Sequence, residues 1–381
     1  MLVMIFVNDL SSVHGLPWWT HHAHAEQNRM TYVDMVFPFF LFIVGMSMPL
    51  AIAQRLRRDT SLWALWRHVA LRGGGLIVLG LILANADQGD GVRMGLNPYA
   101  WAIAGLLGGI LFWLQPSRAK AGSMLYKVLH GLGLVLLIAV YALFRRTTAD
   151  GHTAWIDGSY PEILGLIGYT YLCTALLYIP TRRWLWAPVA WLLIAVGFCA
   201  LSTARLVHFP PPHTPPYLWP FDNGAFATLT LAGIVTSNIF FGAHRWPALR
   251  SRMLLALGTA TIVLLAAWLF APLGISKIRA TPTWCLASAG ASMLAFALLY
   301  WLCDVRGKQA WARLIKPAGD NTLLTYLVPD LVYFTLTLCG VTYLQAHATS
   351  GMAGVLRAVC FTLVMLALSG ILTRLGVRLK L

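Results

Sequence analysis

The sequence has 381 residues, of which 59% are hydrophobic and only 11% are charged. Soluble domains carry roughly 25% charged residues and need polar side chains to cover their surface, so an ordinary soluble enzyme and a disordered chain are both excluded. The formal net charge is +15, and on so apolar a chain basic cytoplasmic loops explain it better than binding to nucleic acid. These figures predict an all-α, polytopic bundle of transmembrane helices.

Taken in chain order, the apolar stretches predict eleven membrane spans. They lie at residues 33–53, 69–86, 97–114, 126–144, 160–179, 185–203, 224–242, 253–271, 281–302, 320–341 and 353–373. Residues 1–8 predict only part of a further helix, because eight residues rise about 12 Å and the hydrocarbon core is about 30 Å thick. We expect one transmembrane domain over residues 1–381, with no cleavable signal peptide.

Basic residues show which loops face the cytoplasm. Most of the 28 Lys and Arg residues fall in alternate loops, of which residues 54–68 form the first. The positive-inside rule therefore places these loops and the C-terminus in the cytoplasm.

The first loop is the densest polar segment and faces outward in this topology. Its side chains of metal-ligand type are His21, His22, His24 and Glu26. Asp34 follows at the mouth of a very apolar span, where a carboxylate is costly to bury and marks a functional site. Three interpretations stay open: a metal site, although the spacing fits no zinc motif; a solvated loop without chemistry; and a catalytic histidine beside a carboxylate.

Residues 24–45, HAEQNRMTYVDMVFPFFLFIVG, resemble a signature of the heparan-α-glucosaminide N-acetyltransferases and their bacterial relatives. That signature reads His-Ala-x-x-Asn-Gly-x-Thr-x-x-Asp-Leu-Val-Phe-Pro-x-Phe-x-Phe-Ile-x-Gly, and Arg29 stands at its glycine. Two weaker similarities are residues 160–169, YPEILGLIGY, which resemble a bacterial branch with a domain of unknown function, and residues 319–326, GDNTLLTY, which resemble a late segment of the family.

The resemblance implies transfer of an acetyl group from cytosolic acetyl-CoA, as co-substrate, to the amine of a terminal glucosamine across the membrane. By position His24 matches the catalytic histidine, and Asn8 and Asp34 match polar residues beside it. Pro329 stands where the lysosomal-type enzymes have a second histidine. The residues that we expect to contact the acceptor are Trp18, Trp19, Glu26, Asn28 and Asp330. We expect no resident metal.

Acetyl-CoA carries phosphates, so its cytoplasmic mouth should be basic. The residues that flank this mouth in the loop are Arg55, Arg57, Arg58 and Arg67, and we place Arg72 one turn into the next helix. Arginine binds phosphate through paired donors, although the positive-inside rule alone predicts the same residues. On the outer side, proline and aromatic residues in the loop 205–223 form either a lip for the sugar or an interfacial belt.

Two functions compete. The first is a transmembrane acyltransferase that acetylates an amino sugar at the periplasmic face of a bacterial inner membrane. The alternative is an inner-membrane N-acetylglucosamine (amino-sugar) transporter, because bacterial proteins that resemble this chain are linked to N-acetylglucosamine use. A degenerate relative with a structural role is a weaker third interpretation. The expected partners are the amino-sugar or glycan substrate and the lipid bilayer, with a homo-oligomer left open and nucleic acid not expected.

Overall fold

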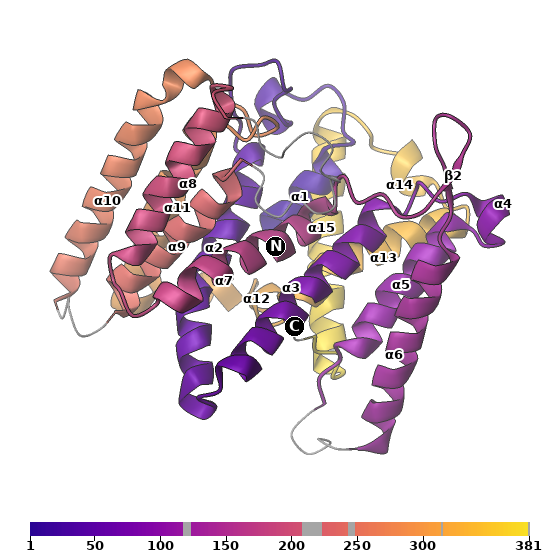
Figure 1. Ribbon diagram of the computed structural model, residues 1–381. Helices are drawn as coiled ribbons and strands as arrows, with labels where there is room; N and C mark the ends of the chain where they lie inside the picture. Colours follow the sequence, from indigo (N-terminus) through magenta and orange to yellow (C-terminus); the bar gives the residue numbers. More distant parts are fainter. Residues whose placement is uncertain (117–122, 208–222, 243–247, 314, 380–381) are drawn as a thin grey trace. The chain divides into compact units, whose positions relative to one another are not determined.

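The computed structural model describes residues 1–116, 123–207, 223–242, 248–313 and 315–379, and most of these residues are helical (Figure 1). A helix lies in each of the eleven predicted spans. These helices are α2 (Val33–Arg58), α3 (Leu62–Ala84), α5 (Pro98–Phe112), α6 (Met124–Leu143), α7 (Glu162–Thr181), α8 (Ala187–Thr203), α9 (Ala225–Phe241), α10 (Leu249–Leu269), α11 (Pro282–Tyr300), α13 (Thr322–Leu338) and α15 (Gly351–Arg374).

Seven of these helices are long and apolar enough to cross a membrane, judged by length and composition. They are α2, α3, α6, α7, α10, α11 with its continuation to Val305, and α15. The helices α5, α8, α9 and α13 are apolar but shorter. The predicted all-α membrane bundle is therefore confirmed, and the chain is a multi-pass membrane protein. The count of eleven spans stays a prediction.

Short elements complete the described chain. The predicted partial helix at the start is α1 (Leu2–Leu10), and α4 (Gly91–Met94), α12 (Lys316–Asp320) and α14 (Tyr343–Ala346) are single turns. Tighter 3₁₀ turns lie at Trp18–Thr20, Ala271–Leu273 and Ala310–Arg313, and a wider π turn extends α11 over Trp301–Val305. The strands β1 (Arg146–Thr147) and β2 (Thr153–Ala154) form a small antiparallel hairpin.

Local sequence explains where helices start. Asn97 accepts a hydrogen bond from the Tyr99 amide at 2.9 Å, and Pro98 occupies the first turn, so α5 begins with a capped, preorganised turn. In the same way, Asp90 accepts from the first amides of α4, which ends at Gly95 in the left-handed region. The pKa of the Asp90 carboxyl is lowered, chiefly by a hydrogen bond from Thr147.

The predicted cytoplasmic loop 54–68 is much shorter in the structure, because α2 continues to Arg58 and α3 already begins at Leu62. Arg72 therefore lies almost three turns inside α3 rather than one turn, which corrects the sequence-based placement. The physical reason is that Gln, Leu and Arg are good helix formers, so the helices extend beyond their apolar segments. Arginines in the last turn of α2 also interact favourably with the negative end of the helix dipole.

The chain divides into two compact units that interleave in sequence. Residues 1–17, 75–165 and 310–381 form the first unit, and residues 18–74 and 166–309 form the second. The chain passes between the units within α3 and within α7. The expectation of one domain over residues 1–381 stays a prediction.

Within the first unit, α1 packs on α15, and α13 packs on both α5 and α15, while α6 lies along α5. Buried aromatic rings fill the interior, as shown by Trp101 and Phe144, whose centroids are 4.6 Å apart. The Trp101 indole donates to the Val140 carbonyl at 2.6 Å, so its polar atom is also satisfied. This unit holds the Asn8 and Asp330 side chains that the sequence singles out.

Within the second unit, α9 is the central helix and packs against α2, α8, α10 and α11, which stand around it (Figure 1). Glycines allow the closest approach. A Cβ atom at Gly45 would overlap the Thr230 carbonyl oxygen of α9, and a Cβ atom at Gly233 would overlap the Phe42 carbonyl oxygen of α2. Small residues at helix crossings are the usual means of close packing in membrane bundles.

Replacing Gly45 by alanine should therefore destabilise the protein by about 1–3 kcal/mol, because the added methyl group meets backbone that can move only with its helix. Thermal unfolding of the detergent-solubilised protein measures this effect. Gly258→Ala is the matched control, since a Cβ there meets nothing within 4 Å. An equal midpoint for the two variants would contradict the tight crossing of α2 and α9.

Candidate functional site

Asp34 anchors the outer loop to the start of α2. The residue is fully buried in the first turn of the helix. Its Oδ2 accepts hydrogen bonds from the Thr31 amide at 2.9 Å and from the Ala23 amide at 3.4 Å, and its Oδ1 lies 2.6 Å from His22 Nδ1. A carboxylate at a helix N-terminus is favoured by the unpaired amides and the helix dipole. Asp34 thus joins three points of the loop to one helix end.

His22, rather than His24, is the histidine that Asp34 holds. The Asp34 contact uses Nδ1, and the Lys277 ammonium lies 3.5 Å from Nε2 on the other side of the ring. A lysine ammonium can only donate, so Nε2 accepts from it and Nδ1–H donates to the carboxylate. Both nitrogens of His22 are therefore engaged, and this ring positions the loop.

His24 follows immediately and its ring is exposed. Its amide donates to Gln27 Oε1 at 3.2 Å, and its carbonyl accepts from the Gln27 amide at 3.0 Å, so the main chain forms a tight turn. In the part of the chain that the structure describes, no hydrogen bond or ion pair involves the His24 ring. The loop therefore fixes the His24 backbone while leaving its imidazole available.

Arg29, which stands at a glycine of the resembled signature, has a structural role in this loop. Its Nε donates to Gln27 Oε1 at 3.1 Å, and its guanidinium lies 4.4 Å from the Trp18 ring centroid. The side chain thus joins Trp18 to the turn at His24 by a cation–π contact. The Trp19 ring is tilted against that of Tyr32, with 6.1 Å between the ring centroids, and Trp19 is half exposed.

Two further residues of this loop, Asn28 and Glu26, are predicted to contact the acceptor sugar, and they differ in their contacts. Asn28 accepts a hydrogen bond from the Ile275 amide through its Oδ1 and so ties the loop to the α10–α11 connection. Glu26 is exposed, and within the described residues no polar contact of its carboxylate is found. Most of the loop 205–223 lies outside the described residues. No three His, Cys, Asp or Glu side chains in the described ranges gather to hold a metal ion.

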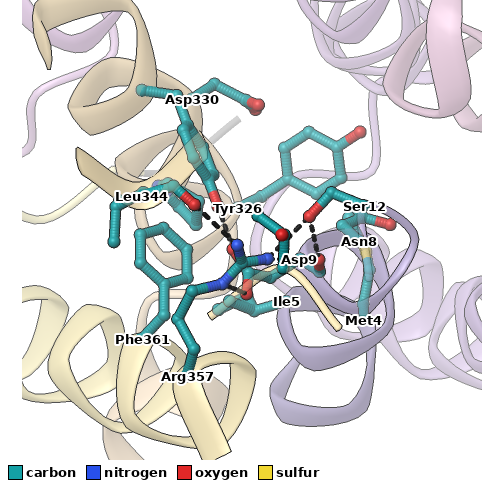
Figure 2. A pocket seen from close by; sticks show the side chains of 13 residues that line it. Met4, Ile5, Asn8, Asp9, Ser12, Tyr326, Asp330, Leu344, Arg357 and Phe361 are labelled. Carbon is teal, nitrogen blue, oxygen red and sulfur yellow. Dashed lines mark hydrogen bonds and ion pairs between the residues drawn. The ribbon is translucent and has the colours of Figure 1, made fainter. Parts of the chain in front are cut away.

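The first unit contains a cavity of about 390 Å³ between α1, α13 and α15 (Figure 2). Two residues predicted from sequence, Asn8 and Asp330, both line it. The other polar residues that line it are Asp9, Ser12, Tyr326, Tyr333, Thr349 and Arg357. The structure therefore brings together residues that lie more than 300 positions apart in the chain.

A buried ion pair forms one wall of this cavity. Arg357 Nε lies 3.4 Å from Asp9 Oδ2, and the two side chains are 10% and 1% exposed. The Arg357 guanidinium also donates to Ser12 Oγ at 2.6 Å and to the Leu344 carbonyl at 2.6 Å (Figure 2). In addition, the Tyr333 hydroxyl donates to Asp9 Oδ1. These partners satisfy most, but not all, of the buried polar atoms of the pair.

Sequence reasoning missed Asp9 and Arg357. Asp9 directly follows Asn8 within an apolar helix, and it is one of only 13 acidic residues in the chain, which was the available signal. Arg357 lies within an apolar span, where a charge also needs a partner. Their pairing joins α1 to α15 and requires the tertiary structure to be seen.

A second carboxylate group lies on the same side of the unit. Glu162, in the first turn of α7, accepts a hydrogen bond from the Tyr326 hydroxyl at 2.9 Å. Its backbone has a φ of 57°, which is unusual for a residue other than glycine, so its position is constrained by its contacts. Glu162 therefore both begins α7 and holds a tyrosine that lines the cavity.

The predicted donor-side arginines differ in their surroundings. The Arg72 guanidinium lies 5.2 Å from the Tyr171 ring centroid, and the charge of Arg55 also acts on the Tyr171 phenol. The other predicted arginines, Arg57, Arg58 and Arg67, are exposed on α2 and α3.

Comparison with known proteins now adds to these observations. The family described as Domain of unknown function (DUF5009) matches residues 12–204, more than half of the chain. The chain belongs to this family. The match contains the outer loop, α2 and the Arg72 region, and it stops before most of the second unit.

The chain is also similar to two curated enzymes. It is 34% identical over 101 residues to the heparan-alpha-glucosaminide N-acetyltransferase of Homo sapiens, and 32% identical over 101 residues to the enzyme of that name from Mus musculus. Each match covers 26% of this chain and 14% of the relative. The resemblance noted in the sequence is therefore confirmed as a partial relationship to these enzymes.

Proposed function

We propose that this protein is a membrane acetyltransferase that moves an acetyl group from cytosolic acetyl-CoA to an amino sugar at the periplasmic face of a bacterial inner membrane. The observation that carries the proposal is the loop at His24. Asp34 and His22 hold the preceding residues, and the His24 ring is left unengaged among the described residues. Partial identity to two N-acetyltransferases supports the same reaction class.

His24 is assigned the role of catalytic residue. The acceptor amine must lose a proton before its lone pair can attack the thioester carbonyl, and a neutral imidazole can take that proton. The C–N bond then forms, the C–S bond breaks, and coenzyme A leaves as a thiol after protonation. The same imidazole can instead accept the acetyl group first and pass it to the amine. Both routes need a free His24 ring.

The cavity of the first unit has the size and the polar lining of a small-molecule site. Its volume of about 390 Å³ falls within the range of roughly 300–1,000 Å³ usual for small-molecule sites. Asp330 offers a carboxylate to an ammonium or to sugar hydroxyls, and Asn8 offers both a donor and an acceptor. Trp18, Trp19, Glu26 and Asn28 are assigned to the acceptor side of the outer loop. Arg55, Arg58, Arg67 and Arg72 are assigned to the phosphates of acetyl-CoA.

The test uses purified protein, acetyl-CoA labelled in its acetyl group, and glucosamine. The expected product is labelled N-acetylglucosamine, identified by mass spectrometry. The His24→Ala variant, purified identically, controls for contaminating acetyltransferases. Absence of product with folded wild-type protein, or equal product from the two preparations, would overturn the proposal.

A transporter of amino sugars remains the second candidate, since a polar cavity within a membrane bundle is also expected of a permease. Uptake of labelled N-acetylglucosamine into proteoliposomes without acetyl-CoA separates the two functions. Uptake that persists in the His24→Ala variant favours transport. Lack of uptake together with acetylation favours the enzyme.

A further inference from the structure

The second unit carries an apolar groove that acetyl transfer does not use. It has a volume of about 800 Å³ and lies against α8, α9 and α10. Of its lining residues only Arg57, Asn238 and Thr259 are polar. Leu193 of α8 and Ile262 of α10 line it and are 66% and 68% exposed. In a membrane these side chains face hydrocarbon, so the groove is open to lipid.

The groove has a charged end. Arg57 lies in the last turn of α2, and the neighbouring lining residues come from helix ends: Leu185 just before α8 and Gly242 just after α9. All three positions border loops that the positive-inside rule places in the cytoplasm. In the described part of the chain no carboxylate pairs with Arg57. An unpaired cation thus marks the cytoplasmic mouth.

The groove is at least as long as one leaflet is deep. On α10 the lining runs from Leu255 to Ala266, which corresponds to about 16 Å at about 1.5 Å per residue, and half of a hydrocarbon core about 30 Å thick is about 15 Å. The lining also includes Leu286 in the second turn of α11, a helix end that the predicted topology places outward. An acyl chain whose headgroup lies at Arg57 would therefore have an apolar wall over the depth of its leaflet, and the groove continues beyond it.

We propose that this groove binds one anionic phospholipid of the cytoplasmic leaflet, with the phosphate at Arg57 and an acyl chain along α8 and α10. Three observations on one surface carry this proposal: the apolar walls, a cation at one end that has no carboxylate partner among the described residues, and a length that covers one leaflet. The occupant is a lipid because the exposed walls face hydrocarbon and the charge lies at headgroup depth. Arginine also binds phosphate with paired donors, which suits a phospholipid headgroup.

Native mass spectrometry of the full chain in detergent tests the site, with phosphatidylglycerol and phosphatidylcholine offered in equal amounts. Wild-type protein should retain phosphatidylglycerol preferentially, and Arg57→Gln should reduce that retention by about fivefold, the factor that corresponds to about 1 kcal/mol for one arginine at an anionic surface. Thr259→Trp should reduce retention of both lipids because the indole fills the groove. The matched controls are Arg58→Gln on α2 and Thr261→Trp on α10, which lie outside the groove lining and should retain lipid as wild type does.

Three results would overturn the proposal. The first is equal retention of the two lipids by wild-type protein. The second is equal retention by Thr259→Trp and Thr261→Trp. The third is a dimer that Thr259→Trp dissociates, because the groove would then be an interface between copies of this chain. Each result is independent of acetyltransferase activity, so the proposed function can fail while the lipid site stands.

Discussion

Replacing His24 by alanine is expected to lower kcat for acetyl transfer by about 10²–10⁴-fold, the usual contribution of a positioned acid–base group. Replacing His22 by alanine should lower it less, by about tenfold to a hundredfold, because this change only loosens the loop that carries His24. The difference follows from the ring contacts. His22 is engaged at both nitrogens by Asp34 and Lys277, whereas the His24 ring has no partner in the described chain. Acetylation of glucosamine under saturating substrates measures both values.

Two further measurements separate catalysis from positioning. Added imidazole should partly restore the His24→Ala variant, since a small base can enter the vacated space, and it should not restore His22→Ala. His22→Gln should recover much of the lost activity because its amide can still donate to Asp34. His21→Ala is the matched control for loss of a neighbouring histidine and should stay near the wild-type rate. If His22→Ala were the variant without activity and with imidazole rescue, the roles of the two histidines would be exchanged.

Replacing Arg357 by methionine is expected to destabilise the protein by about 3–5 kcal/mol, because the buried Asp9 carboxylate then loses its counter-charge. Asp9 Oδ2 lies 3.4 Å from Arg357 Nε, and Asp9 Oδ1 accepts a hydrogen bond from the Tyr333 hydroxyl. The Asp9 side chain is almost inaccessible to solvent. A charge left without a partner at such a position is far costlier than the loss of one hydrogen bond. Chemical unfolding in detergent, followed by tryptophan fluorescence, measures the change.

A double variant makes this prediction sharper. Asp9→Leu combined with Arg357→Met removes both charges, so it should be more stable than Arg357→Met alone, and the non-additivity should exceed about 1 kcal/mol. Arg374→Met on the same helix is the control, because Arg374 is exposed and makes no ion pair within the described residues. Additive effects, or equal effects of the two arginine replacements, would mean that the Asp9–Arg357 pair is not formed.

Hydrophobic run length was enough to locate the helices. Each apolar stretch from residues 33–53 to 353–373 contains a helix, because backbone groups in hydrocarbon must be paired within the segment. The ends were less predictable. The polar residues 54–58 continue α2 instead of forming a loop. Hydrophobicity alone does not predict this, because arginine and glutamine are polar and still favour the helix.

The candidate site, too, could be predicted only in part from the sequence. A costly carboxylate in an apolar helix was enough to single out Asp34, and the cavity brings Asn8 and Asp330 together as lining residues. The partner of Asp34 was not predictable, because His22 and His24 lie two positions apart in one loop and spacing alone does not distinguish them. The loop turns between them, so that His22 faces the carboxylate and the His24 ring is exposed.

The sequence by itself determined that this protein is a bundle of apolar helices and which family signature its outer loop resembles. Which loops face the cytoplasm stays a prediction. These properties depend on composition, run length and local order, all of which are readable along one chain. Only the tertiary structure decided that Asp9 pairs with Arg357, that Asp34 holds His22, and that Arg57 lies at the mouth of a lipid-sized groove. Such contacts join residues far apart in the chain, and they are set by how helices pack rather than by any local preference.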